Sequence, residues 1–195
     1  MKYLTRGNHK LPNHTAIFDL PEIKTCPGAT KECLSYCYAK KATKVYKAVA
    51  PKREWNFQAS MKDNFVSEIC NEIQRMRGLV DVRLHSAGDF YNQAYVNKWT
   101  DIVKAFPKIR FTFYTKSFHL YDFSKLRKCK NVTAFASIDP TTPATRLPYA
   151  KGWKKATVIK KGDDNPKGYF VCPGSCKTCN HCYKGNTSNV AFHQH

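Results

Sequence analysis

The sequence has few acidic residues for its length. Its 195 residues include 14 Asp and Glu against 33 Lys and Arg, which gives a formal net charge of +19 and a pI near 9.6. So large a positive excess favours polyanionic partners, nucleic acid above all, because the release of condensed counterions drives the association. Charge alone leaves one alternative open, a basic soluble protein whose charge only keeps it in solution.

Long hydrophobic runs are also lacking. The N-terminal segment has no apolar run of signal-peptide length, and no stretch approaches the roughly 20 apolar residues that span a bilayer. We therefore expect a cytoplasmic protein without membrane contact. The chain has no long linker, low-complexity tract or repeat, and with 42% hydrophobic residues it has enough apolar mass for a core. It predicts a single α/β domain over residues 1–195.

Strand and helix patterns alternate along most of the chain, whereas residues 1–25 show no sustained periodicity. Helices are expected over residues 34–49, 54–77, 92–106 and 121–129. The buried stripe of the longest helix is Phe57, Met61, Phe65, Ile69, Ile73 and Met76. Strands are expected over residues 80–86, 110–117, 131–139, 155–161 and 168–171. This alternation predicts a partial (β/α) barrel or an open, mainly parallel sheet, with cysteine-rich loops at both ends of the chain.

Three of the expected strands end in small, polar or charged residues. The stretches that follow them are "HSAGD", "TKS" and "SIDP". In parallel α/β folds, ligands bind where the carboxyl ends of the strands converge. The residues expected to line such a pocket are His85, Gly88, Asp89, Lys116, Ser137 and Asp139. The alternative is structural: Asp89 caps a helix, Gly88 makes a turn, and Ser117 and Ser137 end their strands.

Seven of the nine cysteines fall into two groups. The first group, in "TCPGATKECLSYCYAK", is Cys26, Cys33 and Cys37. The second group, in "CPGSCKTCNHC", is Cys172, Cys176, Cys179 and Cys182. In a reducing cytoplasm, clustered thiols bind metal or carry out redox chemistry more often than they form a disulfide framework.

Two kinds of metal centre compete for these thiols. Zinc takes four tetrahedral ligands, commonly from two Cys-x-x-Cys hooks a dozen or more residues apart. Cysteines separated by two or three residues are typical of iron–sulfur clusters, so the second group favours a [4Fe–4S] cluster, with zinc as the alternative. Four cysteines can saturate one cluster, and the other three then leave one iron of a second cluster open. A single cluster that draws on both groups is the competing arrangement.

The first cysteine group, followed by the strand and helix alternation, resembles the radical S-adenosylmethionine superfamily. Tyr36 precedes Cys37 as the superfamily's aromatic residue does, although the cysteine spacing differs, and Ala87-Gly88-Asp89 loosely matches its glycine-rich turn. The resemblance implies binding of S-adenosylmethionine. It makes His85, Asp89 and Lys116 the candidate catalytic residues. The candidate cofactor-binding residues are Tyr36, Gly88, Asp89, Ser117, Ser137 and Asp139.

A second resemblance extends over nearly the whole chain. The motifs "CPGATKECLSYCYA", "VRLHSAGDFYNQAYVNKW", "FTFYTKS", "CPGSCKTCNHCY" and "NVAFHQH", in this order, are similar to the phage family called gene product 88. This resemblance implies a viral origin and a host cytoplasm, and it implies no particular reaction.

Two stretches are rich in Lys and Arg and free of acidic residues. Residues 40–53 and residues 141–161 each hold six basic residues. Lys40, Lys44 and Lys47 are expected on one helical face, and Tyr149 and Trp153 are available to stack on bases. Three functions follow from these patterns: an iron–sulfur enzyme of radical S-adenosylmethionine type, a non-catalytic nucleic-acid-binding protein with Fe–S clusters or zinc, and a zinc-stapled interaction protein.

Overall fold

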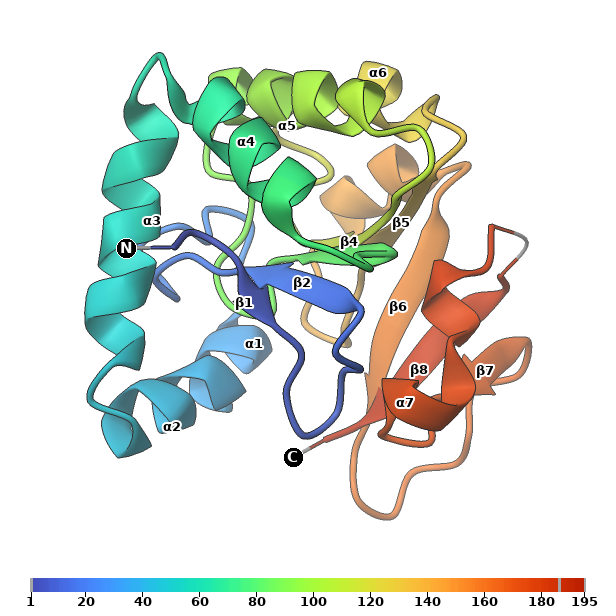
Figure 1. Ribbon diagram of the computed structural model, residues 1–195. Coiled ribbons are helices and arrows are strands. Elements are labelled where there is room, and N and C mark those ends of the chain that lie inside the picture. Colours follow the sequence, from blue (N-terminus) through green and yellow to red (C-terminus); the bar gives the residue numbers. More distant parts are fainter. Residues whose placement is uncertain (1, 186, 195) are drawn as a thin grey trace.

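The chain folds around one eight-stranded sheet. A computed structural model describes residues 2–185 and 187–194 (Figure 1). The strand order is β1-β2-β3-β4-β5-β6-β8-β7, and every pair is parallel except β1 and β2. The strands are β1 Thr5–Arg6, β2 Thr15–Phe18, β3 Asp81–Leu84, β4 Arg110–Thr115, β5 Val132–Ser137, β6 Lys154–Ile159, β7 Tyr169–Val171 and β8 Asn189–His193.

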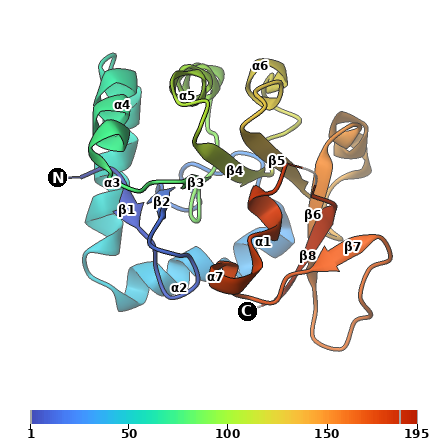
Figure 2. The same ribbon diagram turned by 45° about the vertical axis from the view of Figure 1, so that its right-hand side comes forward.

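Helices lie on both sides of this sheet. They are α1 Lys31–Ser35, α2 Tyr38–Val45, α3 Val49–Met61, α4 Phe65–Arg75, α5 Gln93–Ala105, α6 Ser124–Arg127, η1 Ala144–Ala150, α7 Cys176–Cys179 and η2 His181–Tyr183. In Figure 2, α4, α5 and α6 stand in a row along one face, and α1, α2 and α7 lie on the opposite side. We call these the outer and inner faces. The strands β2 to β6 follow one another in chain order, as they do in a barrel, but the sheet does not close.

The main hydrophobic core lies between the sheet and the outer helices. Alternate residues of the central strands, such as Leu84 and Phe113, are fully buried in it against α4 and α5. Trp99 of α5 packs edge-on against Phe18 and Phe65, with ring centroids 5.2 and 5.9 Å away. The burial of each such side chain stabilises the folded state by about 2 kcal/mol. This layer therefore holds in place the sheet whose strand ends carry the candidate site residues.

The inner face is covered by the C-terminal cysteine segment. Thr112 of β4 points away from the main core, and its hydroxyl donates to the carbonyl of Cys182 over 3.1 Å. The amide of Cys176 donates to the carbonyl of Lys10 over 2.9 Å. A second apolar cluster joins Phe135 of β5 with Cys172 and Cys182. Residues 172–183 therefore form a cap over the middle of the sheet.

The structure confirms the mixed α/β class and the open, mostly parallel sheet. The first prediction that it corrects concerns residues 1–25, which were expected to be irregular. They contain β1 and β2, and β2 is the strand from which the parallel series starts. All four residues of β2 are buried, so no alternation of polar and apolar residues marks it in the sequence.

Both N-terminal helix predictions also need correction. The helix expected over residues 54–77 is broken between α3 and α4, and Met61, expected in its buried stripe, is 48% exposed. The helix expected over residues 34–49 is broken at Cys37, the N-cap of α2. Pro51 lies in the first turn of α3, where no intrahelical partner is lost, so it does not end a helix. The expected cysteine-rich loops are partly helical, since Cys33, Cys176, Cys179 and Cys182 belong to short helices.

Candidate functional site

The carboxyl ends of β2, β3, β4 and β5 are tied together by buried carboxylates. The first is Asp19, which follows β2. Its Oδ1 accepts hydrogen bonds from the amides of Ser86 and Ala87, over 2.6 and 3.0 Å, in the turn after β3. This contact joins the ends of two neighbouring parallel strands, and it fixes the "HSAGD" stretch in which predicted site residues lie.

Asp89 ties that same stretch to the end of β4. Its carboxylate accepts hydrogen bonds from the Thr115 hydroxyl over 2.6 Å and from the Lys116 amide over 2.8 Å. The Ser117 hydroxyl and the Phe90 amide donate to it as well, over 3.2 and 2.7 Å. Burial raises the pKa of Asp89 to about 6, although all four hydrogen bonds oppose that change. The carboxylate is thus held by the protein's own donors.

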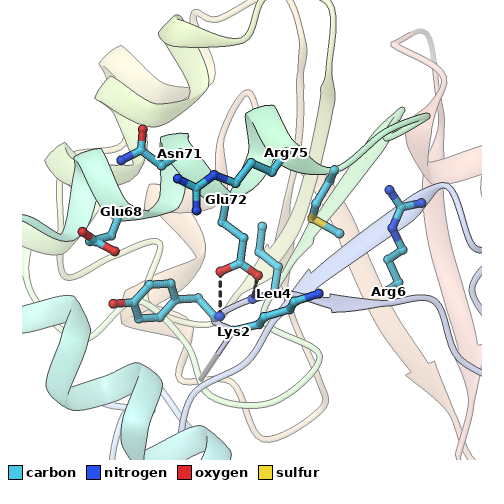
Figure 3. A pocket seen from close by; sticks show the side chains of 9 residues that line it. Lys2, Leu4, Arg6, Glu68, Asn71, Glu72 and Arg75 are labelled. Carbon is cyan, nitrogen blue, oxygen red and sulfur yellow. Dashed lines mark hydrogen bonds between the residues drawn. The ribbon is translucent and has the colours of Figure 1, made fainter.

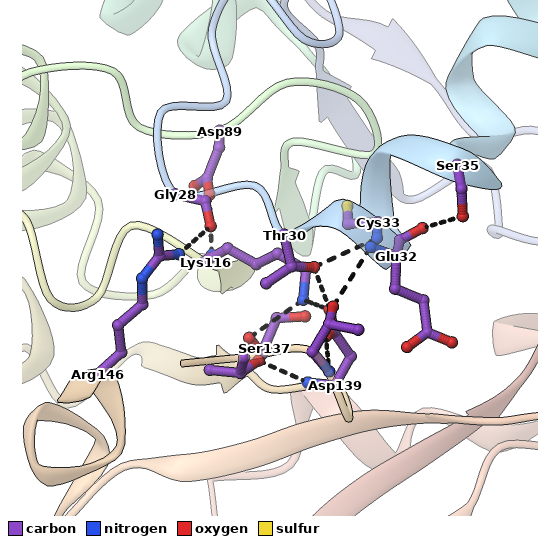
Figure 4. A network of polar contacts seen from close by, with 12 residues as sticks. Gly28, Thr30, Glu32, Cys33, Ser35, Asp89, Lys116, Ser137, Asp139 and Arg146 are labelled. Carbon is purple, nitrogen blue, oxygen red and sulfur yellow. Dashed lines mark hydrogen bonds and ion pairs between the residues drawn. The ribbon is translucent and has the colours of Figure 1, made fainter. Parts of the chain in front are cut away.

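Lys116 and Asp139 form a buried ion pair between the ends of β4 and β5 (Figure 4). Lys116 Nζ lies 2.5 Å from Asp139 Oδ2, and the Thr30 hydroxyl donates to the same oxygen over 2.5 Å. Burial opposes ionisation of Asp139, but these two hydrogen bonds keep its pKa below the ordinary value. Thr30 is also the N-cap of α1, where it accepts from the Cys33 amide. The strand ends therefore hold α1 in place.

Gly28 lets the loop before α1 run directly over the end of β4. A Cβ at this position would lie 2.3 Å from the Lys116 carbonyl oxygen. The Gly28 carbonyl accepts a hydrogen bond from Arg146 over 2.9 Å. Gly88 is needed for a different reason: its φ is +78°, and a Cβ would lie 2.6 Å from Leu20 and Thr25.

The remaining candidate residues lie around this network. His85 is buried, its Nε2 lies 2.9 Å from the Tyr95 hydroxyl, and burial together with Arg83 lowers its pKa to about 3. It is therefore a neutral side chain among aromatic rings. The Ser137 carbonyl accepts a long hydrogen bond of 3.4 Å from Lys116 Nζ. Burial, followed by the charge of Asp139, raises the pKa of Tyr36. Their catalytic and cofactor-binding roles, S-adenosylmethionine included, stay predictions.

The thiols of each cysteine group lie close enough to interact. Burial, with a contribution from Asp89, raises the pKa of Cys26 to about 12, and Cys33 and Cys37 add to the effect. In the second group, burial raises the pKa of Cys182 to about 11 although Arg83 opposes the change. These two thiols are therefore uncharged at neutral pH.

Among residues 2–185 and 187–194, no three His, Cys, Asp or Glu side chains are grouped so that they could hold a metal ion. The description of the chain as a metal-binding, iron–sulfur protein is therefore wrong for this part of the chain.

The two basic stretches are only partly exposed surfaces. Within residues 40–53, Lys41, Lys44 and Lys47 are exposed, but α2 ends at Val45, so Lys47 does not share its helical face. Residues 141–161 are divided by β6, which starts at Lys154 and ends at Ile159, so Lys154 and Lys160 lie at opposite ends of this strand. The expectation that Trp153 is free to stack on bases is wrong. It is 9% exposed, and the Arg127 guanidinium lies 4.2 Å above its ring.

A groove that the sequence did not suggest lies between β1 and α4 (Figure 3). Its volume is about 700 Å³, and Lys2, Arg6 and Arg75 give it three cations. Glu72 at its centre accepts hydrogen bonds from the amides of Tyr3 and Leu4, over 2.7 and 3.0 Å. This carboxylate is thus used to hold the N-terminal strand.

Within the described residues, no helix is long and apolar enough to cross a membrane.

The fold and the strand-end network define a basic α/β protein with two groups of cysteines. The chain belongs to the gene product 88 family, whose model matches residues 2–170. It is 27% identical to the Gene 88 protein of Mycobacterium phage L5, over 97% of this chain and 91% of that protein. It is 25% identical to the Gene 88 protein of Mycobacterium phage D29, over 71% of this chain and 62% of that protein. No solved structure matches the chain, so the resemblance to radical S-adenosylmethionine enzymes is not shown.

Proposed function

We propose that this protein binds nucleic acid, without catalysis, through a basic rim formed by α1, α2 and the two residues that follow α2. The rim consists of four exposed lysines and one exposed aromatic residue, namely Lys31, Lys41, Lys44, Lys47 and Tyr46. The observation that carries the proposal is that none of these lysines forms an ion pair with a described residue. Their charge is therefore free for phosphate groups.

The carboxylates near the rim are already neutralised by other cations. Glu22 pairs with the buried Arg53, with 2.8 Å between Oε2 and Nη1. Glu54 pairs with Lys24 over 2.9 Å. Glu32, within α1, pairs with Lys160 over 2.7 Å. Because each of these acids has its own partner, none of them neutralises the rim lysines. The rim is therefore a positively charged surface on a molecule whose net charge is +19.

Phosphate contacts and base stacking explain how such a surface would bind. Each lysine that neutralises a phosphate releases condensed counterions, which makes binding depend steeply on salt and little on sequence. Tyr46 is 63% exposed, which leaves its ring open to stack on an unpaired base. The rim thus combines charge with an aromatic surface, as proteins that bind nucleic acid without sequence preference do.

The test is a salt titration. Fluorescence anisotropy with a random-sequence duplex should give a plot of log K against log salt in which the four rim lysines account for a slope of about −3.6. The triple variant Lys41→Gln, Lys44→Gln, Lys47→Gln should flatten the slope by about 2.7, because three phosphate contacts are lost.

The matched control removes the same charge at the opposite end of the sheet. Lys104, Lys108 and Lys130 are exposed and lie before the starts of β4 and β5, so their replacement by Gln should leave the slope nearly unchanged. Equal weakening by both triple variants would mean that net charge, and not the rim, is responsible. Absence of salt-dependent binding in the wild-type protein would overturn the proposal.

A further inference from the structure

Arg83 lies at the centre of the inner face, beneath the cysteine cap. In the sheet it is in register with Ile17 of β2 and Thr112 of β4. Its guanidinium lies over the ring of Tyr114, with 4.0 Å between Cζ and the ring centroid. Tyr114 in turn stacks on Phe135 at 4.7 Å, so the platform beneath the guanidinium is rigid.

This cation has no anionic partner. Among the described residues, Arg83 forms no ion pair and no hydrogen bond. The titratable groups that face it are the phenols of Tyr114, Tyr183 and Tyr38 and the thiol of Cys182. None of these groups is a carboxylate.

The nearest carboxyl groups are used elsewhere. Asp19 feels the charge of Arg83, but its Oδ1 accepts from the backbone of Ser86 and Ala87, and burial raises its pKa. Asp81, at the start of the same strand, is held by Arg110. A charge that is taken out of water is normally paired or hydrogen-bonded, because desolvation is otherwise costly. Arg83 is half-buried and has no such partner within the chain, so its guanidinium is available to a partner from outside.

The surroundings leave an approach to this side chain. Arg83 and Tyr114 both keep part of their surface in contact with solvent, although burial is the leading influence on the pKa of each. Tyr38, at the start of α2, is 54% exposed and stands on the side of the first cysteine group. Cys176 and Cys182 stand on the side of the cap. The half-exposed guanidinium therefore lies between residues of the two cysteine groups.

We propose that Arg83 anchors an anion-binding site on the inner face, which takes a small ligand with a carboxylate or phosphate group. A guanidinium offers two parallel N–H donors that match either oxyanion, and charge-assisted bonds of this kind are the strong ones. The ring of Tyr114 holds the guanidinium from below and leaves its edge free to donate. Because the cap covers the face, the ligand is a small molecule and not a polymer, so this site is separate from the basic rim.

The test is a titration of the full-length protein with inorganic phosphate and, separately, with acetate. Both are compared with chloride at constant ionic strength and pH, and the arginine Nε–H resonances are followed by NMR. The Arg83 resonance, assigned by its loss in Arg83→Lys, should shift saturably with one of the two anions and not with chloride. A larger response to phosphate or to acetate identifies the group that the site takes.

Variants separate this site from ordinary surface binding. Arg83→Met should weaken binding of the preferred anion about tenfold or more, since hydrogen bonds to a charged group are lost. The control Arg77→Met removes an exposed arginine and should change nothing. If Arg83→Met does not fold, the wild-type titration decides alone. No saturable shift with either anion, or an equal loss in Arg77→Met, would overturn the proposal.

Discussion

At the scale of single residues, Asp89 shows burial and hydrogen bonding in competition at one carboxyl group. Its four donors favour the ionised form, yet burial prevails and the pKa rises to about 6. A carboxyl group in an unfolded chain has a pKa of about 3.9. The folded state therefore binds this proton more tightly, so the stability that Asp89 supplies is complete below about pH 4 and is lost as the pH rises through 6.

Asp89→Asn should abolish this pH dependence. The difference of roughly two pKa units corresponds to about 3 kcal/mol, so the wild-type advantage over the variant in free energy of unfolding should shrink by up to that amount between pH 4 and pH 7. Urea denaturation at both pH values measures it. A wild-type advantage that grows with pH would mean that the hydrogen bonds, and not burial, control this carboxyl group.

The buried ion pair of Lys116 and Asp139 gives stability the opposite dependence on pH. The pKa of Asp139 is lowered although burial opposes this, because Lys116 and Thr30 donate to its carboxylate. Its contribution to stability is therefore present above the unfolded pKa of about 3.9 and is lost as the pH falls through the lower folded value.

Lys116→Met should destabilise the protein by about 3–5 kcal/mol at pH 7, because it leaves Asp139 charged, buried and without its cation. Adding Asp139→Asn to this variant should recover part of the loss, since the unpaired charge is then removed. Urea denaturation of the two single variants and the double variant at pH 7 measures the coupling. Additive losses would show that the two side chains do not act as a pair.

At the scale of elements, the position of α1 depends on a close approach of two backbones. The loop before the helix passes over the end of β4 at Gly28, where there is no space for a Cβ. The same loop leads to the Thr30 cap, which is bonded to Asp139. The short helix has no buried residue of its own, so its place depends on these contacts and not on apolar packing.

Gly28→Ala should therefore displace α1. The new methyl group would overlap the Lys116 carbonyl, and overpacking of this kind costs about 1–3 kcal/mol. The loss should appear as faster hydrogen exchange at Cys33 and Leu34 and as a lower denaturation midpoint. Gly185→Ala is the matched control, since no atom lies within 4 Å of a Cβ built there. Equal effects of both substitutions would contradict a close approach at Gly28.

At the scale of the whole molecule, the sequence was most informative where polar and apolar residues alternate along a strand. The strands β3, β4 and β5 were predictable because polar and apolar residues alternate or nearly alternate in them. The convergence of Asp89, Lys116 and Asp139 followed from parallel topology. The strand β2 was not predictable, since burial on both faces removes the alternation. Arg83 fitted the alternation as an outward polar residue, and the cap that partly covers it, residues 172–183, comes much later in the chain.

The order of the last strands leads to another prediction. The strand β8 pairs with β6 on one side and with β7 on the other, and β7 has no other partner among the described strands. A chain truncated after Ser188 should therefore lose hydrogen-exchange protection in both β6 and β7. A control that lacks only residues 194 and 195 should keep it, because β8 ends at His193. Full protection of β7 in the shorter chain would contradict the assigned pairing.

This strand order also bears on how the molecule is made. At about 5–20 residues per second, β8 is synthesised roughly 1–5 s after β7. Until then β6 presents an open edge, with Ala156 to Ile159 unpaired on the side that β8 later occupies. Open strand edges attract other chains, so this interval is when nascent copies of the protein are most exposed to one another. Crowded polysomes, as during rapid expression, should therefore favour pairing between nascent chains. In the finished protein β8 covers this edge of β6.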